Sequence, residues 1–383
     1  MRVLIFSLAY LPFIGGAELA VKEITDRISD IEFDLITVNL DGKQPPQERM
    51  GNVTVHRIGK GTLAKYFFPS SAFKKAQALH QQRRYDVIWA IMANQAGLAA
   101  LKLKKKFSGV KYLLTLQEGD SLRSIWLRTW FMRPRYKAIY RRADHIQAIS
   151  QYLKDRALAY GYRGPASVIP NGVDLALFAQ QASSQSIASI REKIGITTNE
   201  RVIITASRLV EKNGIDLLIR TLRDLKNGQL VVAGVGKLRT KLQALAADIG
   251  VAHRVHFIGH VSHRDLPAYL QLADVFVRPS RSEGLGSAFL EAMAAGLPVI
   301  ATPVGGIPDF LKDRETGIFC AVNNPKDLAS KIELVLHDEP LRQRLIENGR
   351  RLVRSGYEWD KVAREMNAVL HFSPPKRSGG GSL

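Results

Sequence analysis

Short apolar runs alternate along this chain with longer stretches in which apolar residues recur every three or four positions. The short runs are typical of buried β-strands, and the longer stretches are typical of amphipathic helices. Such alternation favours an α/β protein with parallel sheets. Strands are predicted at residues 2–6, 33–38, 53–58, 87–91, 111–116, 145–149, 201–206, 230–233, 254–258, 274–277 and 299–301. Helices are predicted after Gly16 and at 70–82, 95–106, 287–295, 325–337, 339–354 and 358–371.

One stretch, residues 278–309, combines a strand end, a glycine-containing loop, a short helix and a second glycine loop. A helix from about Ser287 to Ala295 ends at Gly296, a residue type that commonly stops helices. The backbone amides of Leu285, Gly286 and Ser287 have no partner inside that helix. Together with the helix dipole they predict a site for a phosphate-like anion.

Two carboxylates flank this predicted anion site. Glu283 lies just before it, and Glu291 lies one turn inside the helix, on the face of Ser287. Carboxylates accept hydrogen bonds from neutral hydroxyls and avoid contact with an anion. A phosphate with a polyol on either side is a nucleotide-sugar. The alternative interpretation is an ordinary capped helix with a solvated Glu face.

The spacing of Glu283 and Glu291, followed by the Gly-Leu-Pro-Val-Ile-Ala-Thr-Pro-Val-Gly-Gly run of 296–306, resembles the retaining GT-B glycosyltransferases of family 4. The resemblance implies two Rossmann-like domains that face each other across a cleft. It also implies that Glu283 contacts donor-sugar hydroxyls and Glu291 the ribose. Residues 1–370 carry further signatures of the family, including a last helix that crosses back to the first domain.

Further donor contacts are expected after the first strand of each half. The planar guanidinium of Arg208 can donate two hydrogen bonds to phosphate oxygens, and Lys212 supplies a single compact positive charge. The resembled family places Arg and Lys there on the donor pyrophosphate, with Lys directly before Gly, whereas Asn213 has that position here. A solvated basic loop is the alternative for Lys212. By resemblance, the loop with Gly15 and Gly16 approaches the donor phosphates. The predicted donor-binding residues are Gly15, Gly16, Gly284, Leu285, Gly286, Ser287 and Glu291, with Arg208, Lys212 and Glu283 as catalytic residues.

The strand at 111–116 ends in Gln117, Glu118, Gly119 and Asp120. Strand ends in open α/β sheets face the ligand crevice. We therefore take Gln117, Glu118 and Asp120 as acceptor-side candidates, with a polar turn as the alternative. The resembled family often has His near Gln117. The chain contains no Asp-x-Asp metal pair, so we expect a metal-independent reaction with no cofactor.

The charge balance adds an anionic partner to this interpretation. Residues 1–165 contain 27 Lys and Arg against 13 Asp and Glu, and the whole chain has a net charge of +20. Within 121–142, seven basic residues and no acidic ones alternate with Trp126, Trp130, Phe131, Tyr136 and Tyr140. This composition favours a membrane-surface segment or an anionic acceptor site. Core packing of the aromatics and nucleic-acid binding are the alternatives, and no nucleic-acid-binding motif accompanies the segment.

The 383-residue length suggests about two to three domains. We expect an acceptor domain at 1–165, joined by a returning helix at 357–372, and a nucleotide-sugar domain at 166–356. A Pro/Gly/Ser tail at 373–383 is expected to be flexible. A single cysteine, Cys320, excludes a disulfide framework, and no apolar run is long enough to cross a membrane. The expected location is cytoplasmic, with peripheral association at the inner face of the cell membrane.

The predicted function is hexose transfer, with retention of the anomeric configuration, from a GDP- or UDP-linked sugar to a lipid-linked or glycan acceptor at the membrane surface. The expected partners are the nucleotide-sugar and an anionic membrane surface or lipid-linked acceptor, without nucleic acid. Two alternatives stay open. A phosphorylase or sugar-nucleotide hydrolase would use the same donor loops, and a non-enzymatic anionic-surface binder would use the charge alone.

Overall fold

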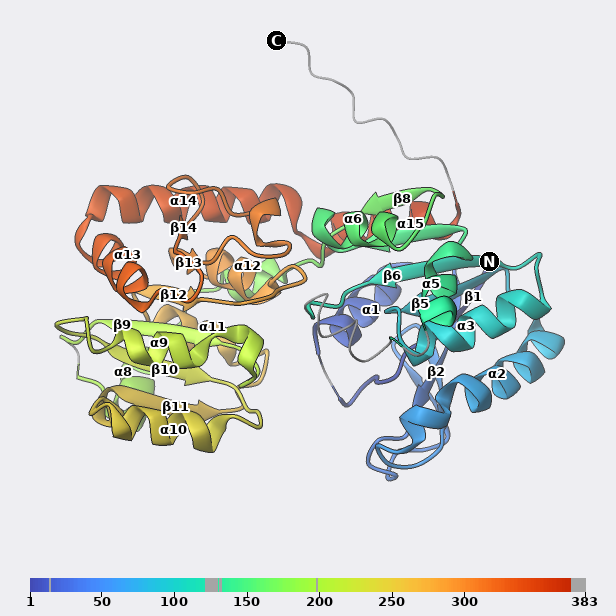
Figure 1. Ribbon diagram of the computed structural model, residues 1–383, viewed down its shortest axis with the longest axis horizontal. Helices are drawn as coiled ribbons and strands as arrows, with labels where there is room; N and C mark the ends of the chain where they lie inside the picture. Colours follow the sequence, from blue (N-terminus) through green and yellow to red (C-terminus); the bar gives the residue numbers. More distant parts are fainter. Residues whose placement is uncertain (14, 121–129, 131–132, 198, 373–383) are drawn as a thin grey trace, which may run out of the picture. The chain divides into compact units, whose positions relative to one another are not determined.

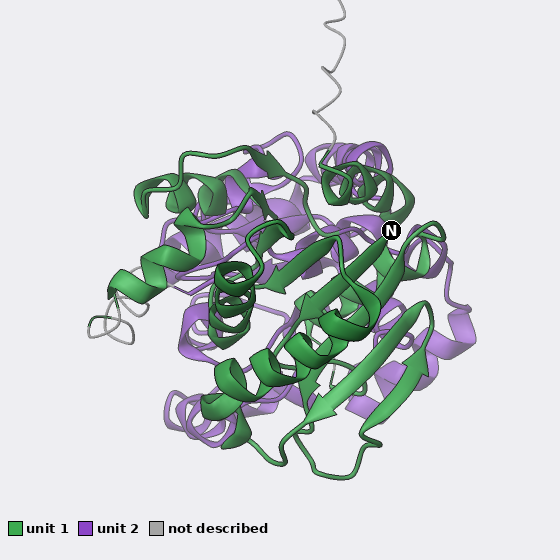
Figure 2. Ribbon diagram, turned by 90° about the vertical axis from the view of Figure 1, so that its right-hand side faces the viewer, with its two compact units in different colours: residues 1–118, 122–171, 359–383 green, residues 119–121, 172–358 purple. Residues whose placement is uncertain are grey.

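The computed structural model describes residues 1–13, 15–120, 130, 133–197 and 199–372. Its helices and strands are labelled in Figure 1. Contacts within the chain divide it into two compact units, coloured separately in Figure 2. The first comprises residues 1–118, 122–171 and 359–383, and the second residues 119–121 and 172–358. Each unit is built on a mainly parallel sheet, which confirms the predicted fold class.

The described part of the first unit contains an eight-stranded sheet in the order β3-β4-β2-β1-β5-β6-β7-β8. All neighbours pair in parallel except β3, which runs antiparallel to β4 at one edge. The strands are β1 (Arg2–Phe6), β2 (Glu32–Val38), β3 (Gln47–Met50), β4 (Val53–Ile58), β5 (Val87–Ile91), β6 (Lys111–Leu116), β7 (His145–Ala148) and β8 (Ala166–Val168). The central strand β5 is buried along its whole length, and β1 and β6 are buried after their first residue, as expected for a parallel sheet with both faces covered.

Helices pack on the sheet of the first unit and bring distant parts of the chain together. They are α1 (Gly16–Asp26), α2 (Ala64–Arg83), α3 (Gln95–Lys106), α5 (Arg133–Arg141), α6 (Gln151–Ala159) and α15 (Trp359–Leu370). Helix α15 packs beside α1, and Arg27 Nε lies 2.8 Å from Asp360 Oδ1. Trp359 and Met366 enter the same apolar core as Val3 and Trp89. The last helix therefore belongs to the first unit.

The second unit contains, among the described residues, a six-stranded parallel sheet in the order β11-β10-β9-β12-β13-β14. Its strands are β9 (Val202–Ala206), β10 (Gln229–Ala233), β11 (Val255–Gly259), β12 (Val275–Arg278), β13 (Val299–Ala301) and β14 (Ile318–Phe319). Its helices are α7 (Leu175–Phe178), α8 (Ser184–Ile194), α9 (Ile215–Thr221), α10 (Arg239–Asp248), α11 (Leu266–Gln271), α12 (Ser287–Ala294), α13 (Pro325–His337) and α14 (Glu339–Gly356). Short 3-10 turns are η2 (Glu211–Asn213), η3 (Ala252–Arg254) and η4 (Ile307–Asp309).

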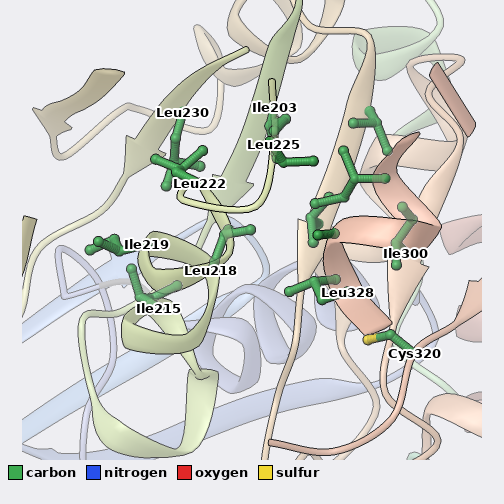
Figure 3. Close-up of a cluster of buried hydrophobic side chains, with 14 of the residues drawn as sticks. Ile203, Ile215, Leu218, Ile219, Leu222, Leu225, Leu230, Ile300, Cys320 and Leu328 are labelled. Carbon is green, nitrogen blue, oxygen red and sulfur yellow. The ribbon is translucent and has the colours of Figure 1, made fainter. Parts of the chain in front are cut away.

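The core of the second unit is formed where the sheet meets its covering helices. Figure 3 shows Ile203 and Leu230 from the sheet together with Leu218, Leu222 and other side chains of the α9 region. Arg281, which lies in the loop after β12, is held by Asp216 on α9, so the same helix carries both core and loop contacts. This packing fixes the carboxyl ends of β9 and β12, from which the loops of the candidate site emerge.

Two kinds of element differ from the prediction. Strand β3 was not predicted because Gln47, Glu48 and Arg49 lack an apolar pattern, as suits an exposed edge strand. Helix α2 begins at Ala64, six residues before the predicted start, and runs through Pro69. Its first amides bond three residues back, as in Tyr66 N to the Leu63 carbonyl at 3.1 Å. The helix thus accommodates a proline near its start, where sequence rules place a boundary.

Candidate functional site

The loop between β12 and α12 leads into the helix start at which the sequence predicts an anion site. Helix α12 begins at Ser287, as predicted, and its N-cap is Gly286 at φ +97°. This left-handed conformation favours glycine. A Cβ at Gly286 would also come within 2.7 Å of the Phe289 ring. No side chain caps this end of α12, so its first amides and its dipole point toward the loop.

Glu283 is fixed in this loop by a buried arginine. Arg278 Nη2 donates to Glu283 Oε2 at 2.7 Å, and the Gly284 amide donates to Oε1 at 3.0 Å. Arg278 is only 5% exposed, and its guanidinium carbon lies 4.5 Å from the centroid of the Phe289 ring. Nη1 reaches the carbonyl of Ala206 at the end of β9, at 3.3 Å. Arg278 therefore sets the orientation of the Glu283 carboxylate.

The second glycine loop lies directly against the first. Gly305 has a φ of +59°, and a Cβ there would overlap the carbonyl oxygen of Glu283. The Gly306 amide donates to that carbonyl at 3.4 Å, and the Thr302 hydroxyl donates to the carbonyl of Ser280. The two loops thus form one backbone-lined surface at the ends of β12 and β13.

Glu291 projects from the second turn of α12. Its Oε1 lies 3.3 Å from His263 Nε2, and the carboxylate is largely buried. The ring centroids of His263 and Phe178 are 5.0 Å apart in an edge-to-face arrangement. Sequence reasoning missed His263 because a lone histidine in a polar turn carries no pattern. The imidazole of His263 therefore occupies one side of the Glu291 carboxylate.

Arg208 and Lys212 belong to the loop after β9. Arg208 is exposed, and its guanidinium makes no hydrogen bond or ion pair within the described residues. Its carbonyl accepts from Asn213 Nδ2 at 2.7 Å, so Asn213, in the usual position of the family lysine, shapes the loop instead. A Cβ placed on Gly119 would lie 3.0 Å from Lys212 Nζ and 2.6 Å from the Gly284 amide nitrogen, so these two groups are close to each other. The structure therefore brings Lys212 to the Glu283 loop.

Arg281 holds the loop after β9 and the Glu283 loop together, and sequence reasoning did not identify it. Its guanidinium donates to Asp216 Oδ1 and Oδ2 at 2.8 and 2.7 Å and to the Glu211 carbonyl at 2.7 Å. Nε donates to Asn323 Oδ1 at 2.8 Å, and the Arg281 amide donates to the Lys212 carbonyl at 2.6 Å. Burial opposes ionisation of Asp216, but these hydrogen bonds and the charge of Arg281 lower its pKa.

The predicted acceptor-side residues have defined partners. Glu118 Oε2 lies 2.9 Å from Arg156 Nη2, and Oε1 accepts from the Ala93 amide. Arg156 is 3% exposed, so this is a buried ion pair. Gln117 Oε1 accepts from Asn171 Nδ2 at 3.0 Å. Asp120, which is grouped with the second unit, lies 3.6 Å from Lys212 Nζ.

The glycine pair of the first unit lies where α1 begins. Gly15 is the N-cap, and its amide donates to Glu18 Oε2 at 2.9 Å, while Gly16 is the first helical residue. A Cβ at Gly16 would meet nothing within 4 Å. There is therefore open space beside Gly16 at the start of this helix.

The basic and aromatic segment 121–142 lies partly outside the described residues, which exclude Trp126 and Phe131. In its described part, Tyr136 and Tyr140 are buried and their hydroxyls are 3.1 Å apart. For these two tyrosines the core-packing alternative is confirmed. The Trp130 side chain is exposed. The predicted tail at 373–383 also lies outside the described residues.

Two negative observations concern the described part of the chain. Its His, Cys, Asp and Glu side chains do not gather in groups of three or more that could hold a metal ion. None of its helices combines the length and the apolar character needed to span a membrane.

Comparison with known proteins matches both halves of the chain. A model described as glycosyl transferases group 1 matches residues 186–352, and one described as glycosyltransferase family 4 matches residues 14–177. An uncharacterised glycosyltransferase of Methanocaldococcus jannaschii is 30% identical over 96% of this chain and 97% of its own. A GDP-mannose-dependent α-(1-6)-phosphatidylinositol monomannoside mannosyltransferase of Mycobacterium tuberculosis is 31% identical over 74% of this chain and 75% of its own.

A solved structure shares the whole fold. Sucrose-phosphate synthase from Thermosynechococcus elongatus superposes with a TM-score of 0.85 at 23% identity, covering 97% of this chain and 98% of its own. At this identity the likeness concerns the fold alone.

Proposed function

This chain belongs to the group 1 glycosyltransferases of GT-B fold, and from that premise we propose that it transfers a hexose from a nucleotide-diphosphate sugar to a lipid-linked or glycan acceptor at a membrane surface, with retention of the anomeric configuration. The observation that carries the proposal is the convergence of Lys212, the Gly284 amide and the Arg278-held Glu283 carboxylate at the start of α12. The positive charge of Lys212 suits an anionic part of a ligand, and the neighbouring Glu283 carboxylate suits a part that carries hydroxyl groups.

The donor diphosphate would lie against the loop after β9 and the first amides of α12. Arg208 offers an exposed guanidinium that has no partner among the residues that the structure describes, and Lys212 offers a second positive charge. When the bond between C1 of the sugar and the phosphate oxygen breaks, negative charge grows on the leaving diphosphate. Donors already aimed at that charge lower the barrier, because little reorganisation is needed during the reaction. We propose that these groups do so without a metal ion.

Two carboxylates would orient the donor on either side of the diphosphate. Glu283, fixed by Arg278 and the Gly284 amide, would accept hydrogen bonds from hydroxyls of the sugar. Glu291, beside His263, would accept from the ribose hydroxyls. A carboxylate that is already held in one rotamer can orient C1 of the sugar for reaction, because little side-chain entropy is lost when the donor binds.

In the transfer step a new bond forms between the acceptor oxygen and C1 while the bond from C1 to the phosphate oxygen breaks. The acceptor proton would pass to the leaving phosphate oxygen, so no protein base is required. We propose that Gly15 and Gly16 approach the donor phosphates and that Gln117, Glu118 and Asp120 serve the acceptor side. Because Glu118 is held by Arg156, its role there would be to position neighbouring backbone rather than to bind the acceptor directly.

A panel of GDP-, UDP- and ADP-sugars tests the proposal. GDP-mannose is the first donor to try, because a relative is GDP-mannose-dependent. Each donor is incubated with the full chain, with and without membrane lipid extract, in the presence of EDTA. We expect one donor to raise the melting temperature and to lose its sugar to an extractable product. Sugar release that is equally fast without acceptor would instead establish a hydrolase, and a requirement for added metal would refute the metal-independent step.

A further inference from the structure

Three neighbouring helices of the first unit contain no acidic residue. Helices α2, α3 and α5 each carry four Lys or Arg residues and no Asp or Glu. Helix α3 packs between the other two, and Figure 1 shows the three lying side by side. A solvated helix face ordinarily mixes both signs of charge. Here the layer presents one sign only, so it forms an extended positive surface.

Many of these basic residues point away from the sheet. Lys74 on α2, Lys102, Lys105 and Lys106 on α3, and Arg135 on α5 are exposed. Lys102 Nζ donates to Ser70 Oγ of α2 at 2.9 Å, which shows that the outer faces of α2 and α3 adjoin. Lys104 and Arg83 instead pair with Asp144 and Asp34. We call Lys74, Lys102, Lys105, Lys106 and Arg135 the basic helix face.

The same outer face of α2 begins with large apolar side chains. Leu63, Tyr66 and Phe67 are 71%, 73% and 72% exposed. Leu63, Phe67, Ser70 and Lys74 follow one stripe at helical spacing, whereas the buried residues Phe68, Ala72, Ala76 and Leu79 follow the opposite stripe. We call Leu63, Tyr66 and Phe67 the apolar tip. The apolar tip stays exposed to water in the folded unit. The other large apolar residues of α2 are buried, except Phe73, which is half-buried.

The apolar tip lies at the functional edge of the first sheet. Helix α2 follows β4 and α3 follows β5, and both strands run parallel to the central strands of that sheet. The first residues of α2 therefore lie near the carboxyl ends of the strands, the edge to which Glu118 after β6 also belongs. Trp130, exposed just before α5, adds another aromatic ring to the sequence that follows β6.

We propose that the basic helix face and the apolar tip together form a docking surface for an anionic lipid bilayer. The proposal rests on the proposed function in that it supplies the route by which a lipid-linked acceptor reaches the carboxyl edge of the first sheet. A bilayer interface accommodates both features: apolar side chains enter the headgroup boundary while lysines meet lipid phosphates. A nucleic acid would match the lysines but would leave Leu63 in water. The bilayer is therefore the partner that the combination favours.

Vesicle sedimentation with the full chain measures this directly. We expect binding to vesicles of phosphatidylcholine mixed with phosphatidylglycerol, little binding to phosphatidylcholine alone, and loss of binding at high salt. Each basic residue near an anionic surface contributes roughly a 5-fold change in partition. The variant Lys102→Gln/Lys105→Gln/Lys106→Gln should therefore bind about 100-fold more weakly. Leu63→Ser/Phe67→Ser should weaken binding roughly 10-fold or more, because apolar burial is lost.

Matched controls separate this surface from charge and apolarity in general. Lys226→Gln/Lys312→Gln/Lys326→Gln removes the same charge from exposed positions of the second unit, and Leu158→Ser removes an exposed apolar residue of α6. Both controls should bind as the unaltered chain does. Equal losses in surface and control variants would overturn the proposal, as would equal binding to neutral vesicles. Displacement of the chain from anionic vesicles by a single-stranded oligonucleotide at equal charge concentration would also overturn it in favour of a nucleic-acid partner.

The donor thermal shift distinguishes failure of the docking surface from failure of the proposed function. If the chain ignores vesicles but a nucleotide-sugar still raises its melting temperature, the docking surface is wrong and the glycosyltransferase proposal stands. If the chain binds anionic vesicles and no nucleotide-sugar stabilises it, the docking surface stands alone. The surface variants should keep the donor-induced shift, because none of their residues belongs to the donor site.

Discussion

Replacement of Arg281 by Ala should impair sugar transfer although Arg281 is not expected to touch the substrate. Its guanidinium connects Asp216 on α9, the Glu211 carbonyl and Asn323, and its amide bonds the Lys212 carbonyl. It directly precedes the segment that carries Glu283. The substitution keeps the amide contact and removes every side-chain contact, so the loop after β9 and the Glu283 loop lose their side-chain connection.

The structure sets the expected size of the effect. The Arg281–Asp216 pair is about one-third exposed on both sides, so solvent screening reduces its contribution to at most about 1 kcal/mol. The hydrogen bonds to two neutral acceptors add about 1 kcal/mol in total after partial replacement by water. A loss of about 2 kcal/mol lowers the melting temperature of a unit of this size by roughly 4–8 °C. Displacement of the loops by about 1 Å should lower kcat/KM about 100-fold.

The assay compares steady-state transfer with melting temperature for Arg281→Ala, Arg281→Lys and Arg220→Ala. Arg281→Lys keeps the charge but cannot make the forked contact with Asp216, so it should recover stability more than turnover. Arg220, an exposed arginine at the end of α9, is the matched control and should change neither. The loss should appear mainly in kcat, because the loops position the diphosphate as it leaves.

Two results would refute this reasoning. Full activity of Arg281→Ala would show that the loops hold their positions without the guanidinium. A loss of activity that disappears when all variants are assayed well below their melting temperatures would assign Arg281 to stability alone.

Three further predictions concern single groups. Arg208→Ala should lower turnover far more than stability, because its guanidinium has no partner among the described residues. Glu291→Ala should mainly raise the donor KM. Steady-state kinetics measures turnover and KM of each variant, and normal kinetics in both variants would contradict the donor site. Burial of Asp34 opposes its ionisation, but the hydrogen bond with His56 and the charge of Arg83 lower its pKa. Its contribution to stability is therefore present above the unfolded pKa of about 3.9 and is lost as pH falls from there through the lower folded pKa. Chemical denaturation should show the stability gap between the unaltered chain and Asp34→Asn shrinking in acid, and a constant gap would contradict this. Burial raises the pKa of Cys320 to about 12, so a thiol reagent at neutral pH should label the chain only after denaturation, and rapid labelling of the native protein would contradict the buried position.

Hydrophobic patterning was sufficient to predict most central strands and the long helices. Strands such as β1 and β5 are continuous apolar runs, and the stripe of α1 is visible in Ala20 and Ile24. Two edge strands were missed for different reasons. Strand β3 is polar and partly faces solvent, whereas β14 packs Ile318 into the core but is only two residues long, too short for a pattern. The start of α2 was missed because a proline that usually ends a helix is tolerated inside its first two turns.

The candidate site was predicted where chemistry is local in sequence and missed where it depends on packing. The Gly286 cap, Glu283 and Glu291 lie within a few residues of one another, and their spacing carries the meaning. The arginines that hold the loop lie close by in sequence, but their roles depend on contacts made only in the folded chain. Arg278 acts through a fold-dependent contact with Phe289, and Arg281 acts through Asp216, 65 residues earlier. No spacing rule links such pairs.

The most direct test of the account follows a carbon-labelled sugar from donor to product. The chain and its Arg208→Ala variant are incubated with the nucleotide-sugar that stabilises the protein and with lipid acceptor, and the one-bond carbon–proton coupling at C1 is recorded by NMR. The account predicts label in a new glycoside with the anomeric configuration of the donor, formed at least 100-fold faster by the unaltered chain. Label that ends only as free sugar, a glycoside of inverted configuration, or equal rates for both proteins would contradict it.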